Sequence, residues 1–252
     1  QIPNLFTLLN LVFGCLAIVF ILQNGIMVTE DSNGMQLLTV PEQVWMASLC
    51  IGLAAVIDFV DGFVARLFRS TSEMGKQLDS LADLVSFGVA PGMIIYQFLR
   101  LSFAQDKDGV DVSIIRLLPA LILPCAAAWR LAKFNLDNAQ SFSFKGLPTP
   151  TTGIFFGSLP VIFWNVNQEW VRDLLLNKWF LYGIVLLFSF LMVSNVPLMS
   201  LKFKDYSLKS NVPKYLLAAI SIASNLILQW LAIPVIVLAY VLISLLFKNK
   251  SA

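Results

Sequence analysis

Residues 58–83 read DFVDGFVARLFRSTSEMGKQLDSLAD and place four aspartates at one end of two strongly apolar segments. Asp58 and Asp61 lie one turn apart on one stripe of a helix, and Asp79 and Asp83 lie one turn apart on a second helix. Ionised carboxylates beside membrane-length apolar runs are energetically costly, so they indicate a functional site. If the two stripes face each other, the four carboxylates converge on one point that could hold divalent cations.

The composition of the chain indicates a polytopic membrane protein. Of its 252 residues, 58% are hydrophobic and 13% are charged, whereas an average soluble domain has about 45–50% and about 25%. No histidine is present, which excludes Ser-His-Asp triads and removes the commonest zinc ligand. The net charge of +2 is too small to indicate a nucleic-acid partner.

Apolar runs of about 20 residues predict an all-α protein with about eight transmembrane helices in a single domain, residues 1–252. No internal repeat is visible, and a sharp turn is predicted near Leu231–Pro234. The predicted spans are Leu5–Gln23, Val44–Arg66, Leu81–Leu101, Ile114–Leu131, Thr152–Val166, Trp179–Asn195, Tyr215–Trp230 and Leu231–Phe247.

The distribution of basic residues predicts the orientation of these spans. With eight spans, most of the 17 lysines and arginines fall on the side that carries both termini and the aspartates. The basic loop that contains Lys202, Lys204, Lys209 and Lys214 is expected to lie against anionic membrane lipids. We therefore expect an integral protein of a prokaryotic cytoplasmic membrane, with the aspartates facing the cytoplasm.

The aspartates offer only oxygen ligands, which favour Mg²⁺ or Mn²⁺ over zinc and also suit Ca²⁺. Four carboxylates suffice for two ions, an arrangement that supports phosphoryl displacement. One alternative is a salt-bridge network in which basic residues neutralise the aspartates; the candidates are Arg66, Arg69 and Lys76. A second alternative is a divalent-cation transporter, although a transporter would place its carboxylates near the bilayer midplane.

The spacing D-x2-D-G-x2-A-R-x8-G-x3-D-x3-D in residues 58–83 resembles the signature of the CDP-alcohol phosphatidyltransferases, and every signature position is filled. The resemblance implies six core helices at about residues 3–197, two further helices at about 214–248, and a homodimer. It also implies a site for two metal ions per subunit at the cytoplasmic surface. The implied reaction transfers a phosphatidyl group from a CDP-lipid to an alcohol and releases CMP.

The resemblance also implies roles for individual residues. The metal ligands would be Asp58, Asp61, Asp79 and Asp83. Asp83 would also be the general base, and in a chain without histidine a carboxylate is the expected proton acceptor. Further contacts to the CDP-lipid would come from Asp61, Gly62, Ala65, Arg66, Gly75 and Asp79.

The first helix carries a polar edge that points toward the same cluster. Asn4, Thr7 and Asn10 recur at intervals of three residues. Asn4 and Thr7 could contact the cytidine or the phosphates of the CDP-lipid. Equally, Asn4 could cap the helix, or these side chains could form hydrogen bonds between helices.

Several other stretches resemble the branch of the family that uses serine: PNLFTLLN (3–10), DSLADLVSFGVAP (79–91), RLAKFN (130–135), FKGLPTP (144–150) and LMVSNVP (191–197). The expected partners are therefore CDP-diacylglycerol and L-serine, which would give phosphatidylserine and CMP. Glycerol 3-phosphate or inositol phosphate is the alternative acceptor. A phosphorylated acceptor would call for a denser basic pocket than Arg130, Lys133 and Lys145 provide.

Four residues are candidates for serine recognition. Arg130 could clamp the serine carboxylate, because a guanidinium can donate two parallel hydrogen bonds. Ser86 and Asn135 could supply neutral hydrogen bonds, and Lys145 could meet a phosphate. Alternatively, Arg130 and Lys145 are basic residues that only extend to the polar interface of the membrane.

Overall fold

The computed structural model describes residues 2–23, 27–30, 36–39, 42–67, 72–105, 112–136, 144–199, 207 and 211–247. Most of these residues are helical, which confirms the predicted all-α class. The exceptions include two short antiparallel strand pairs, β1 with β2 and β3 with β4. The elements are α1 (Ile2–Gln23), β1 (Met27–Glu30), β2 (Gln36–Thr39), η1 (Glu42–Val44), α2 (Trp45–Leu67), α3 (Glu73–Leu84), η2 (Val85–Val89), α4 (Ala90–Ala104), α5 (Ile114–Leu117), η3 (Leu118–Leu121), α6 (Ile122–Leu136), β3 (Phe144–Lys145), α7 (Thr149–Asn165), α8 (Glu169–Leu175), α9 (Lys178–Val193), β4 (Pro197–Leu198), α10 (Val212–Leu228), η4 (Gln229–Leu231) and α11 (Ala232–Leu246).

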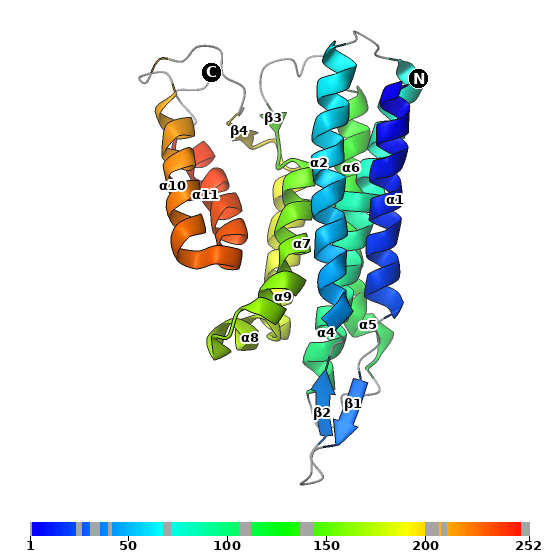
Figure 1. The fold of residues 1–252 in the computed structure, drawn as a ribbon, viewed down its shortest axis with the longest axis vertical. Coiled ribbons are helices and arrows are strands. Elements are labelled where there is room, and N and C mark those ends of the chain that lie inside the picture. Colours follow the sequence, from blue (N-terminus) through cyan, green and yellow to red (C-terminus); the bar gives the residue numbers. More distant parts are fainter. Residues whose placement is uncertain are drawn as a thin grey trace.

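The long helices run alternately up and down in a bundle, and a helical hairpin of α10 and α11 lies on one side (Figure 1). The start of α1, the end of α2 and the end of α11 lie at the same end of the molecule. The four aspartates of the sequence motif lie on the last part of α2 and on α3. We call this end of the bundle the aspartate end.

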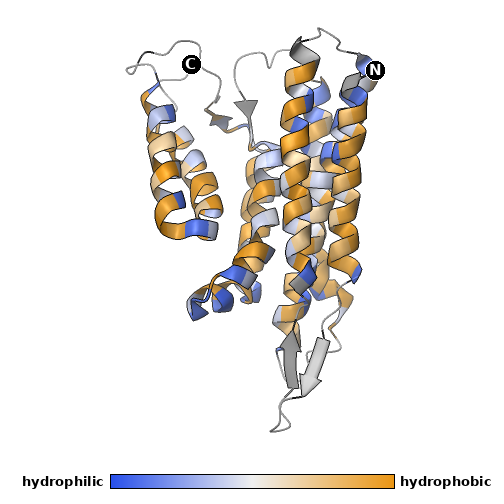
Figure 2. Cartoon of the chain, in the orientation of Figure 1, coloured by the Kyte–Doolittle hydropathy of each residue, from blue (hydrophilic) through white to orange (hydrophobic). Residues whose placement is uncertain are grey.

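Length and composition identify five helical runs in the described part of the chain that could cross a membrane, or six if α8 and α9, bent by 65°, count as one span. The five are Asn4–Gln23, Trp45–Val64, Glu73–Ala104, Ile114–Leu136 and Val212–Leu246. In Figure 2 the long helices are apolar over most of their length, whereas the short α8 mixes hydrophilic and hydrophobic residues. The chain is thus an integral, polytopic membrane protein.

Each of the eight predicted segments forms a helix, but the number of long spans is smaller. The fifth segment forms α7, which has 17 residues and is shorter than the five runs. The last two segments belong to the single run Val212–Leu246, within which α10 and α11 pack side by side (Figure 1).

The hairpin turn lies at η4, slightly before the predicted position. Gln229 has φ 49°, a left-handed conformation that is uncommon for residues other than glycine and that helps to reverse the chain. Pro234 lies in the first turn of α11, where its missing N–H removes no helical hydrogen bond.

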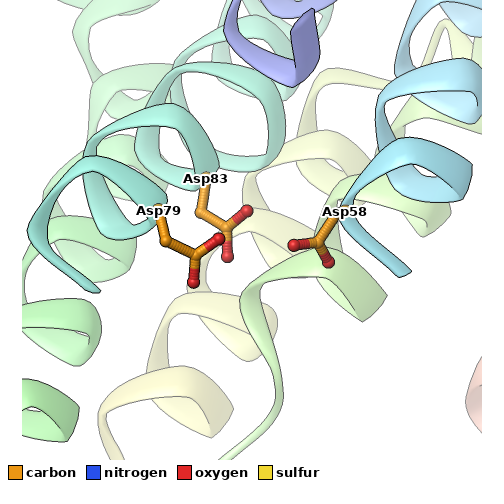
Figure 3. A group of neighbouring side chains, drawn as sticks. All are labelled: Asp58, Asp79 and Asp83. Carbon is orange, nitrogen blue, oxygen red and sulfur yellow. The ribbon is translucent and has the colours of Figure 1, made fainter. Parts of the chain in front are cut away.

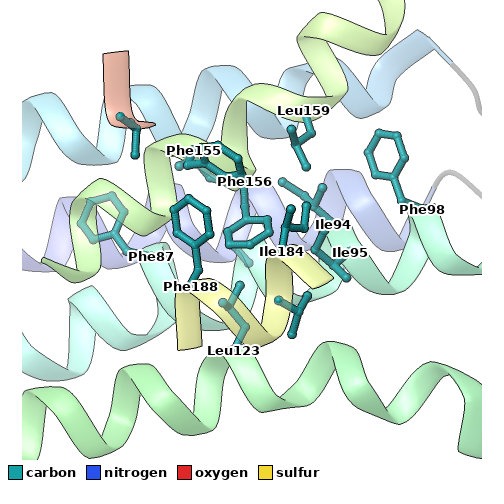
Figure 4. Close-up of a cluster of buried hydrophobic side chains, with 14 of the residues drawn as sticks. Phe87, Ile94, Ile95, Phe98, Leu123, Phe155, Phe156, Leu159, Ile184 and Phe188 are labelled. Carbon is teal, nitrogen blue, oxygen red and sulfur yellow. The ribbon is translucent and has the colours of Figure 1, made fainter. Parts of the chain in front are cut away.

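A layer of buried phenylalanines holds the bundle together below the aspartate end (Figure 4). This phenylalanine layer consists of Phe87 from η2, Phe155 and Phe156 from α7, and Phe188 from α9. The ring of Phe188 lies 4.2 Å from that of Phe155 and 5.2 Å from that of Phe156, measured between centroids. Such pairs contribute about 0.5–1.5 kcal/mol each beyond the burial of their area.

The segment between α3 and α4 is a π-helix, η2, which begins two residues after Asp83. A π turn holds more residues than an α-helical turn and is frequently found at functional sites. Here it lies between the carboxylates of α3 and the core side chain Phe87 on one continuous helical run.

Candidate active site

Three of the four aspartates meet between α2 and α3. One carboxylate oxygen from each of Asp58, Asp79 and Asp83 lies within 4.8 Å of the other two, and the side chains point toward one another (Figure 3). Asp83 is only 8% exposed, and the other two are partly buried. The negative charge of Asp83 is repelled by those of Asp58 and Asp79. Because desolvated like charges are unfavourable without a counter-ion, this group suits a divalent cation.

The fourth aspartate, Asp61, lies beside this group and is bound by α1. Its Oδ2 accepts a hydrogen bond from Thr7 Oγ1. Its Oδ1 is buried and has no hydrogen-bond partner among the described residues. Asp61 also repels Asp58 and Asp79. A buried carboxylate oxygen that lacks a donor is unusual in proteins, and it could serve as an additional ligand to a cation.

A second contact from α1 reaches Asp83. Asn10 Nδ2 donates a hydrogen bond to Asp83 Oδ1 at 3.3 Å. The backbone carbonyl of Asn10 accepts a hydrogen bond from Ser86 Oγ at 3.0 Å. A Cβ atom at Gly14 would lie 2.9 Å from the Cα of Ser86, so α1 approaches η2 closely only because position 14 is glycine. The structure thus uses Ser86, a predicted serine contact, to hold α1 against η2.

Gly75 permits a similar close approach at the start of α3. Its backbone N–H donates to Ser72 Oγ at 2.9 Å, which caps the helix. A Cβ atom at Gly75 would lie 3.1 Å from Asn4 Oδ1. Gly62 is partly buried on α2. Four further residues of the sequence analysis have side chains outside the described residues: Ala65, Arg66, Arg69 and Lys145.

Arg130 turns into the protein from α6 and is 8% exposed, so it does not extend to the membrane surface. Its NH1 donates a hydrogen bond to Thr149 Oγ1 at 3.1 Å. Its Nε is buried without a partner in the described part of the chain. The guanidinium attracts Asp83 and also lies within electrostatic range of Tyr240. Arg130 therefore presents an unpaired donor close to the aspartates.

Thr149 and Tyr240 were not identified as site residues from the sequence. Thr149 belongs to the stretch FKGLPTP, which was noted only for its resemblance. Tyr240 lies on α11 and donates its hydroxyl to the carbonyl of Met199 at 3.0 Å. No sequence motif connects α11 with the aspartates.

Asn135 lies at the end of α6, next to α3. Its side-chain Nδ2 donates a hydrogen bond to Ser80 Oγ at 2.9 Å, and its backbone carbonyl accepts one from Lys76 Nζ at 3.0 Å. Asn135 Oδ1 is buried without a partner among the described side chains. The bond of Lys76 to a neutral carbonyl is an argument against the salt-bridge network that the sequence left open.

Residues 1–191 match the sequence model of the CDP-alcohol phosphatidyltransferases. The chain belongs to the CDP-alcohol phosphatidyltransferase family. This match confirms the resemblance inferred from the aspartate spacing. It ends before α10, so the hairpin and Tyr240 lie outside the matched region.

Relatives with the name CDP-diacylglycerol–serine O-phosphatidyltransferase are found in bacteria. The chain is similar to the protein of Helicobacter pylori strain J99, with 30% identity over 82% of this chain and 75% of the relative. The protein of H. pylori strain 26695 is 29% identical over 99% of this chain and 96% of the relative. The protein of Bacillus subtilis is 33% identical over 61% of this chain and 71% of the relative.

Proposed function

We propose that this chain transfers the phosphatidyl group of CDP-diacylglycerol to the hydroxyl of L-serine, giving phosphatidylserine and CMP. The observation that carries the proposal is the convergence of Asp58, Asp79 and Asp83 within the motif of the family. The choice of serine is supported by the names of the relatives. It is also supported by the buried Arg130, whose unpaired Nε suits a carboxylate.

The four aspartates fit a divalent cation, Mg²⁺ or Mn²⁺ with Ca²⁺ as a further candidate, because they offer hard oxygen ligands. Asp58, Asp79 and Asp83 would be the first ligands, and Asp61 would add its unpaired Oδ1. Four carboxylates suit two ions per subunit. When bound, the ions would offset the charge of the pyrophosphate and of the departing CMP.

Asp83 is the proposed general base. Its carboxylate accepts the hydroxyl proton of serine while the serine oxygen attacks the lipid-side phosphorus of CDP-diacylglycerol. The bond from that phosphorus to the bridging oxygen breaks, and CMP leaves with this oxygen and its electron pair. Asn10 orients the carboxylate through Oδ1, which leaves Oδ2 for the proton. A general base of this kind contributes about 10²–10⁴-fold to the rate.

The proposed wall for the CDP-lipid follows the junction of α1, α2 and α3. Gly62 and Gly75 keep this wall thin, and Thr7 holds Asp61 from α1. The other proposed contacts are Asn4, Ala65, Arg66 and Asp79. For serine we retain Arg130, Asn135 and Lys145. We assign Ser86 an indirect role, because its hydroxyl is committed to the Asn10 carbonyl.

We further propose that the aspartate end faces the cytoplasm of a prokaryotic cell, where CDP-diacylglycerol and serine would both be accessible, and that the enzyme is a homodimer. Oligomeric state can be measured on the purified protein by native mass spectrometry. Labelling of cysteines introduced at the aspartate end, in intact cells and in lysed cells, tests the orientation. Labelling in intact cells by a membrane-impermeant reagent would contradict it.

The decisive experiment measures CMP release from CDP-diacylglycerol by the purified chain with three acceptors: serine, glycerol 3-phosphate and inositol phosphate. We expect release with serine, and loss of this activity on chelation with EDTA. Release that depends on a phosphorylated acceptor would replace serine with that acceptor. Activity that persists in EDTA would contradict the metal site.

A further inference from the structure

A buried tyrosine connects the hairpin of α10 and α11 with the bundle. The hydroxyl of Tyr240 on α11 donates a hydrogen bond to the backbone carbonyl of Met199 at 3.0 Å. Met199 directly follows β4, against which α11 packs. Both segments lie beyond residue 191, where the family match ends. A buried tyrosine hydroxyl usually finds such a partner, so the role of this bond depends on what β4 holds in turn.

β4 is joined by hydrogen bonds to the segment that leads into α7. It pairs with β3 in antiparallel register. After β3, the Gly146 N–H donates to the Val196 carbonyl and the Leu147 N–H donates to the Leu191 carbonyl, both at 2.9 Å. Thr149 begins α7 two residues later. The backbone from Tyr240 to the start of α7 is therefore one connected path of hydrogen bonds and covalent bonds.

The middle of this path is closely packed at Gly146. Gly146 has φ 76°, and a Cβ atom there would lie 2.5 Å from the carbonyl oxygen of Met192 and 2.8 Å from that of Ser194. The backbone between β3 and α7 thus lies directly on the end of α9. Because closely packed interiors transmit displacements, a shift of β4 should reach Thr149 instead of being absorbed on the way.

Thr149 holds the guanidinium of Arg130. Arg130 NH1 donates to Thr149 Oγ1 at 3.1 Å, and both side chains are buried. Arg130 Nε has no partner among the described residues. A guanidinium binds a carboxylate well only in the right plane and direction, so the position of Thr149 matters for such a ligand. Tyr240 also lies within electrostatic range of Arg130.

We propose that Tyr240 is a positioning residue for the acceptor. It acts through the β3–β4 pair and Thr149 to fix the direction of the Arg130 guanidinium, and so it sets the affinity for the carboxylate of the acceptor. The identity of that acceptor as serine rests on the proposed function. The hairpin, which lies outside the family match, then contributes to the choice of acceptor and not to the chemistry at the aspartates.

The first test compares Tyr240→Phe with Tyr182→Phe. Tyr182 of α9 is a matched control, because its hydroxyl also donates to a backbone carbonyl, that of Arg116 on α5, at the end of the bundle remote from the aspartates (Figure 1). We expect Tyr240→Phe to raise KM for serine by about 2- to 30-fold, the usual range for mutations along a coupled network. Its kcat and its KM for CDP-diacylglycerol should stay unchanged, as should all three values in Tyr182→Phe. An unchanged KM for serine in Tyr240→Phe would overturn the proposal.

Serinamide separates a misplaced guanidinium from a general defect, because it carries an uncharged amide in place of the serine carboxylate. The ratio of kcat/KM for serine over serinamide should fall in Tyr240→Phe by the same factor as the affinity for serine. An equal loss with both acceptors would overturn the proposal, since it would indicate a structural role alone.

A double-mutant cycle tests the path itself. Thr149→Val removes the hydroxyl that accepts the hydrogen bond of Arg130. If Tyr240 acts through Thr149, the double variant should raise KM for serine no more than the stronger single variant does. Additive effects would mean that the two residues act independently, which contradicts the path.

Hydrogen–deuterium exchange of the purified full chain measures the path without turnover. Tyr240→Phe should speed the exchange of the Gly146 and Leu147 amides, whose hydrogen bonds join β3 and α7 to the rest of the path. Tyr182→Phe should not. Unchanged exchange in Tyr240→Phe would overturn the proposal. Faster exchange in a protein whose wild type releases no CMP with serine would contradict only the proposed function.

Discussion

Asp83 and Phe87 lie one helical turn apart on the same helical run, yet their surroundings are opposite. Around Asp83, like charges gather and a buried guanidinium keeps one donor unpaired. Around Phe87, the phenylalanine layer is apolar and closely packed, with Gly153 directly against the Phe87 ring (Figure 4). The comparison contrasts a cluster of like charges, which is unfavourable for stability and typical of a ligand site, with an apolar layer that holds the helices together.

The difference between the aspartate cluster and the phenylalanine layer predicts that changes at the aspartates alter turnover more than stability. The largest effect is expected for Asp83→Asn, because the amide cannot accept the serine proton. Turnover should fall by about 10²–10⁴-fold, while the melting temperature stays the same or rises, since one of several repelling charges is removed. CMP release and thermal denaturation measure the two effects.

Asp173→Asn is the matched control for Asp83→Asn, because Asp173 is an exposed aspartate of α8, outside the aspartate cluster. Its turnover should equal that of the wild type. Near-wild-type turnover of Asp83→Asn would remove Asp83 from the role of base.

The phenylalanine layer should show the reverse behaviour. Phe156→Ala is expected to destabilise the protein by about 3–5 kcal/mol, because Phe156 is fully buried and contacts two other rings. Phe190→Ala, on the outer face of α9 with 69% exposure, should change stability far less. Denaturation in detergent measures both. If Phe156→Ala lost turnover at a temperature where it remains folded, the two regions would not be separable.

The boundary between the regions is tested by Thr7→Val, which removes the hydrogen bond to Asp61 but keeps the side-chain volume. Hydrogen bonds to charged groups contribute about 1.5–3 kcal/mol. We expect the loss of this hydrogen bond to weaken substrate binding, so that KM for CDP-diacylglycerol rises by about tenfold or more. Thr7→Ser should restore the affinity, since it keeps the hydroxyl. An equal defect in both variants would indicate a packing role for Thr7 instead.

The smallest effect is expected for Lys76→Met. Lys76 donates to the carbonyl of Asn135 at an exposed position, where water replaces the lost bond, so we expect a cost of about 0.5–1.5 kcal/mol. Thermal denaturation should therefore show a small shift. A shift as large as that of Phe156→Ala would support the salt-bridge alternative, in which Lys76 neutralises the aspartates.

The aspartate spacing predicted that carboxylates of α2 and α3 would meet, but not the position of every carboxylate. Asp58, Asp79 and Asp83 converge as expected. Asp61 lies three residues after Asp58, which turns it by about 60° around the helix axis. This rotation brings Asp61 within reach of Thr7 on α1. Helical periodicity correctly places Asp58 and Asp61 on the same side of α2. It does not distinguish positions within that side, so it could not predict that the two carboxylates point to different neighbours.

Sequence patterns could not give the hydrogen-bond partner of Ser86, the inward direction of Arg130 or the face by which the hairpin packs. Ser86 bonds to α1 because Gly14 lets the two helices touch, and Arg130 points inward because Thr149 accepts its hydrogen bond. The hairpin is apolar on most of its surface, so its sequence does not indicate which face packs against the bundle. These outcomes depend on partners far away in the chain.

The sequence by itself determined the membrane class, the helical segments and the family, because these depend on composition and on spacing within a few helical turns. Only the tertiary structure decided which carboxylates meet, that Arg130 faces Asp83, and that the hairpin is bonded through Tyr240 to the segment after β4. The reason is physical. Local periodicity follows from neighbouring residues, whereas the rotation and separation of packed helices follow from the side-chain volumes of residues that are distant in sequence.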